Sequence, residues 1–310
     1  MAAANRMSKP PSRSLWRPTN ALAALGILIL KVSAKLSFSA QQRLGRAIGN
    51  LVWYVFPYRK GVGMTNLRIC FPEMPEKDRK KLLQKHYQSM GIGVFEMAAA
   101  WYKGWDEVMA QCDVEGLANL KEVDDSGRGA IVFTGHFTTL ELIGRMFLHF
   151  HKLSCHYRHL NQPVLNHELE SIRAQGMQEQ IGITEVKKFI RCLREGQFVW
   201  YTPDQGRRIK YSEILPFFGE PAVTNTTTGR IARAGNAAVI PFTGYRQPDG
   251  RYKIEIFPED PEMVSEDPLV EGAALNRHIE NFVRKAPEQY FWLHKRYKYR
   301  GPEYPDLYAK

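Results

Sequence analysis

The feature that most restricts the fold of this chain is an alternation, from about residue 110 onward, of short apolar runs with amphipathic runs of helical period. Short apolar runs are typical of buried strands, and the runs between them match the 3.6-residue repeat of a helix. Strands that alternate with helices indicate an α/β fold with a mostly parallel central sheet flanked by helices. The expected strands are 130–134, 153–157, 197–202, 237–245 and 252–257, and the expected helices are 138–150, 186–193, 224–234 and 275–285.

The chain before residue 110 is expected to be mainly helical. Leu44, Ile48 and Leu51 recur on one face of a helix over 41–56, and similar spacing predicts one or two helices over 75–102. The segment 58–72 is a basic loop or a short helix. Because the 310 residues contain no linker rich in Gly or Ser, we expect one domain over 41–310, preceded by a separate segment over 1–40.

The N-terminal segment, residues 1–40, begins with basic residues and continues with an apolar run. Residues 1–19 contain four basic residues and no acid, and the apolar run 21–30 is followed by Lys31 and Lys35. Ten apolar residues form a helix of about 15 Å, which is half of a hydrocarbon core of about 30 Å. A membrane-anchoring helix that lies in the interface with a basic rim fits best. A spanning anchor stays open, whereas two lysines before any cleavage site argue against a signal peptide.

The amino-acid composition of the chain indicates which kinds of partner it can bind. The chain has 43 Lys and Arg against 32 Asp and Glu, a net charge of +11, and a chain that is 44% hydrophobic is not disordered. Such a surface favours anionic partners such as phospholipid, lipid phosphate, nucleic acid or an acidic protein. The four cysteines form no CxxC pair, and the histidines between 149 and 167 lack the spacing of a zinc site. We therefore expect no metal and no cofactor.

The candidate catalytic residues are His136 and Glu141. His136 follows the expected strand 130–134 and Gly135, at the strand-to-helix turn where α/β proteins place their sites. A carboxylate that accepts from one ring nitrogen leaves the other nitrogen as a base, so this pair can take a proton from an alcohol. The alternative is a histidine that caps the helix, with Glu141 on the solvent face.

Seven sequence blocks carry a resemblance that decides between these readings. The blocks are 66–73 (NLRICFPE), the His136 and Glu141 pair, Tyr157-Arg158, 199–205 (VWYTPDQ), 216–219 (PFFG), 226–229 (TTTG) and 286–296 (APEQYFWLHKR). With these blocks in order, residues from about 40 to 308 resemble the lipid A secondary acyltransferases of the lysophospholipid acyltransferase-like superfamily. The resemblance implies a glycerol-3-phosphate acyltransferase-like fold.

The resemblance also implies a reaction and its partners. A fatty acyl chain would move from acyl carrier protein to the hydroxyl of a 3-hydroxyacyl chain on a Kdo-bearing lipid A precursor. His136 would be the general base, Glu141 would orient it, and Arg158 would stabilise the oxyanion. The enzyme would need no cofactor. It would lie on the phospholipid surface at the cytoplasmic face of the inner membrane, held by the N-terminal helix.

Five further residues are expected to bind substrate: Tyr157, Asp204, Gln205, Arg207 and Arg208. Asp204 and Gln205 follow a strand end and would either bind the acceptor or brace the site. Arg207 and Arg208 would meet lipid phosphates or the acidic carrier, unless they form a solvated basic loop.

Two rival functions stay open. One is an acyl-CoA-dependent glycerolipid or glycolipid acyltransferase. The other is a non-enzymatic basic protein that binds a membrane or nucleic acid. The basic and aromatic run 294–300 suits a nucleic acid or a membrane interface. Beside an apolar N-terminal helix, the membrane interpretation is favoured, and we expect no nucleic acid partner.

Overall fold

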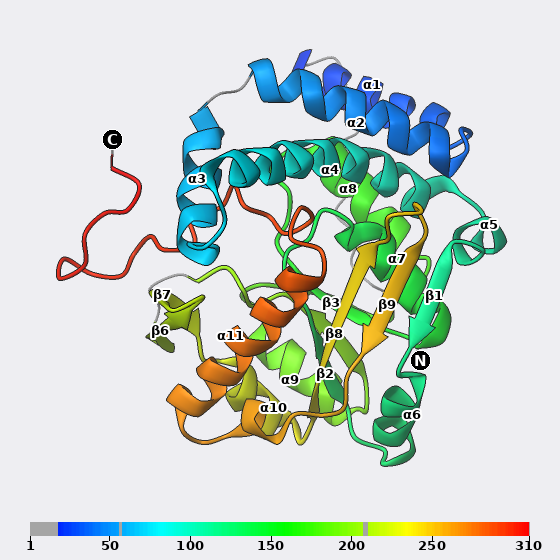
Figure 1. Cartoon of the computed structure of the whole chain (residues 1–310). Coiled ribbons are helices and arrows are strands. Elements are labelled where there is room, and N and C mark those ends of the chain that lie inside the picture. Colours follow the sequence, from blue (N-terminus) through cyan, green and yellow to red (C-terminus); the bar gives the residue numbers. More distant parts are fainter. Residues whose placement is uncertain (1–17, 56–57, 207–209, 310) are drawn as a thin grey trace.

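A seven-stranded sheet runs through the centre of the molecule in the order β1-β9-β8-β2-β5-β3-β4 (Figure 1). The computed structural model describes residues 18–55, 58–206 and 210–309. The strands are β1 (Cys112–Glu115), β2 (Ala130–Phe133), β3 (Ser154–Tyr157), β4 (Gln180–Gly182), β5 (Phe198–Tyr201), β8 (Ala238–Arg246) and β9 (Tyr252–Ile256). Neighbouring strands pair in parallel except β8 and β9, which are antiparallel. The predicted α/β fold with a mostly parallel sheet is therefore confirmed.

Two hydrophobic cores cover the two faces of this sheet. Alternate residues of a strand point to opposite faces, so Ile131 and Phe133 of β2 enter one core and Ala130 and Val132 enter the other. The strand is buried along its whole length, which explains why it appears in the sequence as a continuous apolar run.

The helices after α4 (Glu76–Tyr102) alternate with the strands along the chain. They are α5 (Trp105–Met109), α6 (Leu117–Asp125), α7 (Leu140–Phe150), α8 (Pro163–Arg173), α9 (Val186–Arg194), α10 (Thr228–Gly235), a 3-10 turn at Pro261–Val264, and α11 (Pro268–Lys285). The expected helix 224–234 begins only at Thr228, because the residues before it form β7 (Glu220–Asn225). That strand pairs with β6 (Ser212–Phe217) in a separate hairpin that the sequence did not indicate.

The N-terminal helices are α1 (Pro18–Ser33), α2 (Phe38–Val55), α3 (Tyr58–Cys70) and α4 (Glu76–Tyr102). In Figure 1, α1 and α2 lie side by side over α4, at the end of the molecule opposite α9 and α10. The segment from residue 58 is thus a helix, and 76–102 is one helix rather than two. Among the described helices, none combines the length and the apolar character needed to cross a membrane.

The orientation of α2 differs from what its periodicity suggests. Its apolar residues Leu44, Ile48 and Leu51 are exposed, whereas its glycines face α4. A Cβ atom on Gly91 of α4 would lie 2.1 Å from the carbonyl oxygen of Gly45. The two helix backbones therefore touch at their crossing, and the apolar stripe of α2 points away from the protein.

We predict that Gly91→Ala destabilises the protein because its methyl group has no room at the α2–α4 crossing. Overpacking of this kind costs about 1–3 kcal/mol, measured as the free energy of unfolding in urea by circular dichroism. Gly61→Ala in α3 is the matched control: a Cβ atom there meets nothing within 4 Å. It should leave stability unchanged or raise it by up to about 1 kcal/mol. Equal stability of Gly91→Ala and the wild type would contradict the close crossing.

Candidate active site

The site begins at the carboxyl ends of two neighbouring parallel strands. Phe133, the last residue of β2, is paired in register with Tyr201, the last residue of β5. His136 and Asp204 each follow their strand by three residues. Because parallel strands end at the same edge of the sheet, these equal offsets bring the two side chains together.

His136 and Asp204 form a doubly hydrogen-bonded pair. His136 Nδ1 lies 2.5 Å from Asp204 Oδ1, and the backbone N–H of His136 donates to Asp204 Oδ2 over 2.9 Å. Asp204 is buried, whereas 31% of the His136 side chain is exposed. With Nδ1 carrying the proton donated to Asp204, Nε2 is left with the lone pair of a base.

The electrostatics of the pair favour charge on both partners. Burial by itself lowers the pKa of His136, but the Asp204 carboxylate and its hydrogen bond outweigh burial, and the pKa is raised. Burial likewise acts to raise the pKa of Asp204, and the charge and hydrogen bonds of His136 reverse this, so that the pKa is lowered. The ionised aspartate therefore stabilises an imidazolium, which a general base must become during catalysis.

A distant segment holds the His136 turn in place. The backbone N–H of Phe291 donates to the carbonyl of His136 over 3.0 Å, and the N–H of Thr138 donates to the carbonyl of Gln289 over 2.8 Å. The rings of Phe137 and Tyr290 meet edge to face, with centroids 5.5 Å apart. The C-terminal block 286–296 thus serves to fix the backbone on both sides of His136.

The structure corrects the expected pairing of His136 with Glu141. Within the described residues, Glu141 makes no hydrogen bond to His136. It accepts from Arg173 Nη2 over 2.7 Å and from Trp101 Nε1 over 3.2 Å. The helix α7 begins only at Leu140, so Glu141 lies in its first turn, on the side that faces α4 and α8. The five-residue spacing therefore carries the two side chains to different partners.

Glu141 and Arg173 form a largely buried ion pair. Burial tends to raise the pKa of Glu141, but the charge and hydrogen bonds of Arg173 outweigh it and lower the pKa. The pKa of Arg173 is raised by the same contact, against the effect of burial. Glu141 is therefore held ionised, and its ion pair with Arg173, the last residue of α8, links α7 to α8.

A cavity of about 1200 Å³ opens beside His136 and also reaches Glu141 and Arg173. Its size is that of a large ligand site. The wall is mostly apolar and is formed by Trp101, Trp105, Leu140, Leu148, Leu160, Leu169, Ile172, Met177, Ile183, Val186, Phe189, Ile190, Trp200 and Ile231. An imidazole base at the wall of such a cavity can act on a polar group carried by a long apolar molecule.

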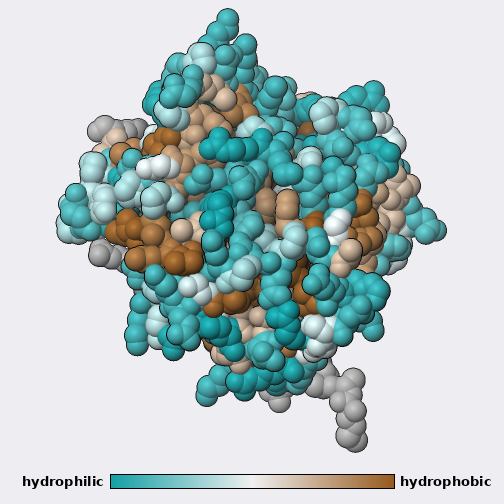
Figure 2. Space-filling view, turned by 60° about the horizontal axis from the view of Figure 1, so that its bottom comes forward, coloured by the Kyte–Doolittle hydropathy of each residue, from teal (hydrophilic) through white to brown (hydrophobic). Residues whose placement is uncertain are grey.

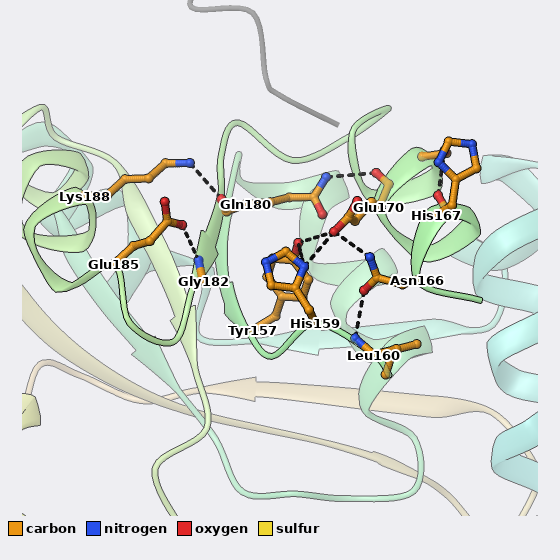
Figure 3. A network of polar contacts seen from close by, with 11 residues as sticks. Tyr157, His159, Leu160, Asn166, His167, Glu170, Gln180, Gly182, Glu185 and Lys188 are labelled. Atoms are coloured by element: carbon orange, nitrogen blue, oxygen red, sulfur yellow. Dashed lines mark hydrogen bonds and ion pairs between the residues drawn. The ribbon is translucent and has the colours of Figure 1, made fainter. Parts of the chain in front are cut away.

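A second polar network holds the chain around Arg158 (Figure 3). The buried carboxylate of Glu170 accepts from the Tyr157 hydroxyl over 2.7 Å and from Asn166 Nδ2 over 2.8 Å, and it lies 2.9 Å from His159 Nδ1. Tyr157 and His159 flank Arg158, which is exposed and lines the cavity. Glu170 therefore fastens both neighbours of the predicted oxyanion residue.

The other predicted substrate-binding residues have different outcomes. Tyr157 lines the cavity, although its hydroxyl is engaged by Glu170, and Gln205 also lines the cavity. Asp204 braces His136, which is the second of the two roles expected for it. Arg207 and Arg208 lie outside the described residues.

Three contributors to the site were missed in the sequence: Trp101, Glu170 and Arg173, all on helices distant from His136 along the chain. Their spacing carries no local signal. The pairing of His136 with Asp204 did have a signal in the sequence, because both residues come three positions after a buried strand.

Comparison with known proteins gives a consistent result. The family described as bacterial lipid A biosynthesis acyltransferase matches residues 9–299. The chain is 31% identical over 299 residues to the lipid A biosynthesis lauroyltransferase of Escherichia coli K12, covering 96% of this chain and 98% of that protein. It is 25% identical over 263 residues to the myristoyltransferase of the same organism, covering 84% and 80%. The expected resemblance to the lipid A acyltransferases is thus confirmed.

Among solved structures, the chain is similar to the 1-acyl-sn-glycerophosphate acyltransferase PlsC from Thermotoga maritima. That structure aligns with 82% of this chain and 99% of its own, with a TM-score of 0.39 and 14% identity.

We predict that Asp204→Asn lowers the pKa of the His136 imidazole relative to the wild type. The substitution removes the carboxylate that raises this pKa and leaves the burial that lowers it. An NMR titration of the ring protons measures the shift. Asp260→Asn, beside His278, is the control and should leave His136 unchanged. A His136 pKa that is the same in Asp204→Asn and the wild type would refute the coupling.

Proposed function

Because the chain belongs to the bacterial lipid A biosynthesis acyltransferases, we propose that it transfers a fatty acyl chain from acyl carrier protein to a lipid A precursor. The acceptor in this proposal is the hydroxyl of a 3-hydroxyacyl chain on a Kdo-bearing precursor. The observation that carries the proposal is the His136–Asp204 pair at the wall of a large apolar cavity. Both the acyl donor and the acceptor bring long apolar chains and one reacting polar group to such a site.

The proposed reaction uses the lone pair on His136 Nε2. As the acceptor oxygen attacks the thioester carbonyl, His136 takes the hydroxyl proton and becomes an imidazolium beside ionised Asp204. The tetrahedral intermediate then collapses, the C–S bond breaks, and the proton passes from His136 to the leaving thiolate. The products are an ester on the acceptor and the free thiol of the carrier.

The developing oxyanion needs a hydrogen-bond donor or a positive charge. We assign this role to Arg158, which lines the cavity and is held between Tyr157 and His159 by the Glu170 network. Glu141 then acts through Arg173, as a fixed polar contact in the wall, and not through His136. This differs from the mechanism expected from the sequence.

We predict that His136→Ala abolishes most of the acyl transfer while the protein stays folded. General-base help is worth about 10²–10⁴-fold in rate. The assay is mass spectrometry of the Kdo-bearing precursor after incubation with acyl carrier protein thioesters of several chain lengths, with acyl-CoA in parallel. His149→Ala, at an exposed residue of α7, is the matched control and should retain activity.

The pH profile gives an independent readout of the same role. The active base is neutral His136, so kcat/KM rises with pH through its raised pKa. In Asp204→Asn, this acid limb should move to lower pH and the plateau should fall. Wild-type turnover by His136→Ala, or an acid limb unmoved in Asp204→Asn, would reject the proposed base.

We also propose that the enzyme rests on the phospholipid surface at the cytoplasmic face of the inner membrane through α1 and α2. Both helices expose apolar side chains: Leu22, Leu25, Leu28, Ile29 and Val32 on α1, and Leu44, Ile48, Leu51 and Val55 on α2. Arg43 and Arg46 are exposed on α2 among them. Apolar side chains with cations close by are typical of helices that lie in a membrane interface, and water is a poor environment for such a face.

We predict that replacing Leu25, Ile48 and Leu51 together by Ser weakens binding to vesicles of phosphatidylethanolamine and phosphatidylglycerol by roughly tenfold or more, because three apolar contacts are lost. Co-sedimentation of the full chain measures the partition coefficient. Leu269→Ser replaces an exposed leucine at the start of α11 and is the control. Equal binding by the triple variant and the wild type would place the membrane contact elsewhere.

A further inference from the structure

One side of helix α9 lines the cavity, and another side carries three exposed basic residues. Val186 and Ile190 line the cavity together with Ile183, which precedes the helix. Lys187, Arg191 and Arg194 are exposed and follow each other at intervals of four and three residues. Residues at such intervals share one face of a helix, so the three cations form a row beside the cavity rim. We name this row the α9 ridge.

The charge of the α9 ridge is not neutralised by the protein. In the part of the chain that the structure describes, Lys187 and Arg194 form no ion pair, and Arg194 meets only the neutral carbonyl of Ala234, to which its Nε donates over 2.9 Å. Arg191 approaches Glu195 at 3.6 Å and Glu179 at 3.7 Å, with half of its side chain exposed. Exposed pairs at such distances contribute little. The neighbouring Lys188 differs, because it forms an ion pair with Glu179 over 2.8 Å and also donates to the carbonyl of Gln180 over 2.8 Å (Figure 3).

The position of the α9 ridge separates it from the proposed membrane face. In Figure 1, α9 lies at the end of the molecule opposite α1 and α2, so one flat bilayer cannot contact both. Figure 2, in which that end is turned toward the viewer, shows hydrophobic side chains in separate patches enclosed by hydrophilic surface. A face of this kind fits a soluble macromolecule better than a lipid surface.

We propose that the α9 ridge docks the acidic carrier protein that brings the acyl thioester. This inference rests on the proposed function and names the surface that the donor uses. A carrier bound at Lys187, Arg191 and Arg194 lies beside the cavity rim, so that its thioester arm enters over Val186 and Ile190. Complementary charge of this kind raises the rate of association and makes it sensitive to salt.

The test is the variant Lys187→Glu/Arg191→Glu/Arg194→Glu in the full chain. The KM for carrier-bound donor should rise by roughly 10–100-fold, because attraction at three sites becomes repulsion, while kcat stays within about twofold. Lys77→Glu/Lys80→Glu/Lys85→Glu on α4 makes the same charge change at three exposed lysines away from the cavity and is the matched control. An unchanged KM in the ridge variant overturns the inference.

A binding measurement separates this inference from the reaction itself. Fluorescence anisotropy with labelled, unacylated acyl carrier protein should show salt-sensitive binding to the wild type and the control, and loss of binding in the ridge variant. That loss supports the ridge even if no thioester donor supports turnover, a result that would defeat the proposed function alone. If the ridge variant still binds the carrier as the wild type does, the docking surface is overturned. The same holds if the ridge variant loses affinity only for phosphatidylglycerol vesicles.

Discussion

The parallel register between β2 and β5 is the constraint on which the site depends. Since Phe133 and Tyr201 are paired, the turns that follow them place His136 and Asp204 at one point of the sheet edge. A slip of this register would separate the imidazole from its carboxylate and leave a buried charge without a partner, which is costly. The apolar side chains that bury both faces of β2 therefore also position the proposed base.

The rest of the site follows from the need to pair buried polar groups. Glu141 is held by Arg173 and Trp101, and Glu170 is held by Tyr157 and Asn166. The Glu141 contacts join α7 to α4 and α8, and the Glu170–Tyr157 contact ties α8 to β3 of the sheet. The cavity beside these residues can be large and apolar because the polar side chains in its wall form their hydrogen bonds with other protein groups.

The N-terminal helices show where a sequence pattern reaches its limit. Periodicity correctly predicted that α2 is a helix and that Leu44, Ile48 and Leu51 share a face. It did not predict that this face is exposed, because an apolar stripe can meet a core or a lipid surface equally well. The glycines that contact α4 settle the orientation, and their significance depends on a crossing that is visible only in three dimensions.

By itself, the sequence determined the α/β class, five of the seven strands of the sheet and the place of His136 just after a strand end. These features depend on local periodicity and on where strands stop, both of which are written in neighbouring residues. The tertiary structure alone decided that Asp204 and not Glu141 holds His136, that Glu141 belongs to Arg173, and which face of α2 is covered. Such choices depend on strand register and helix packing, which bring together residues that are far apart along the chain.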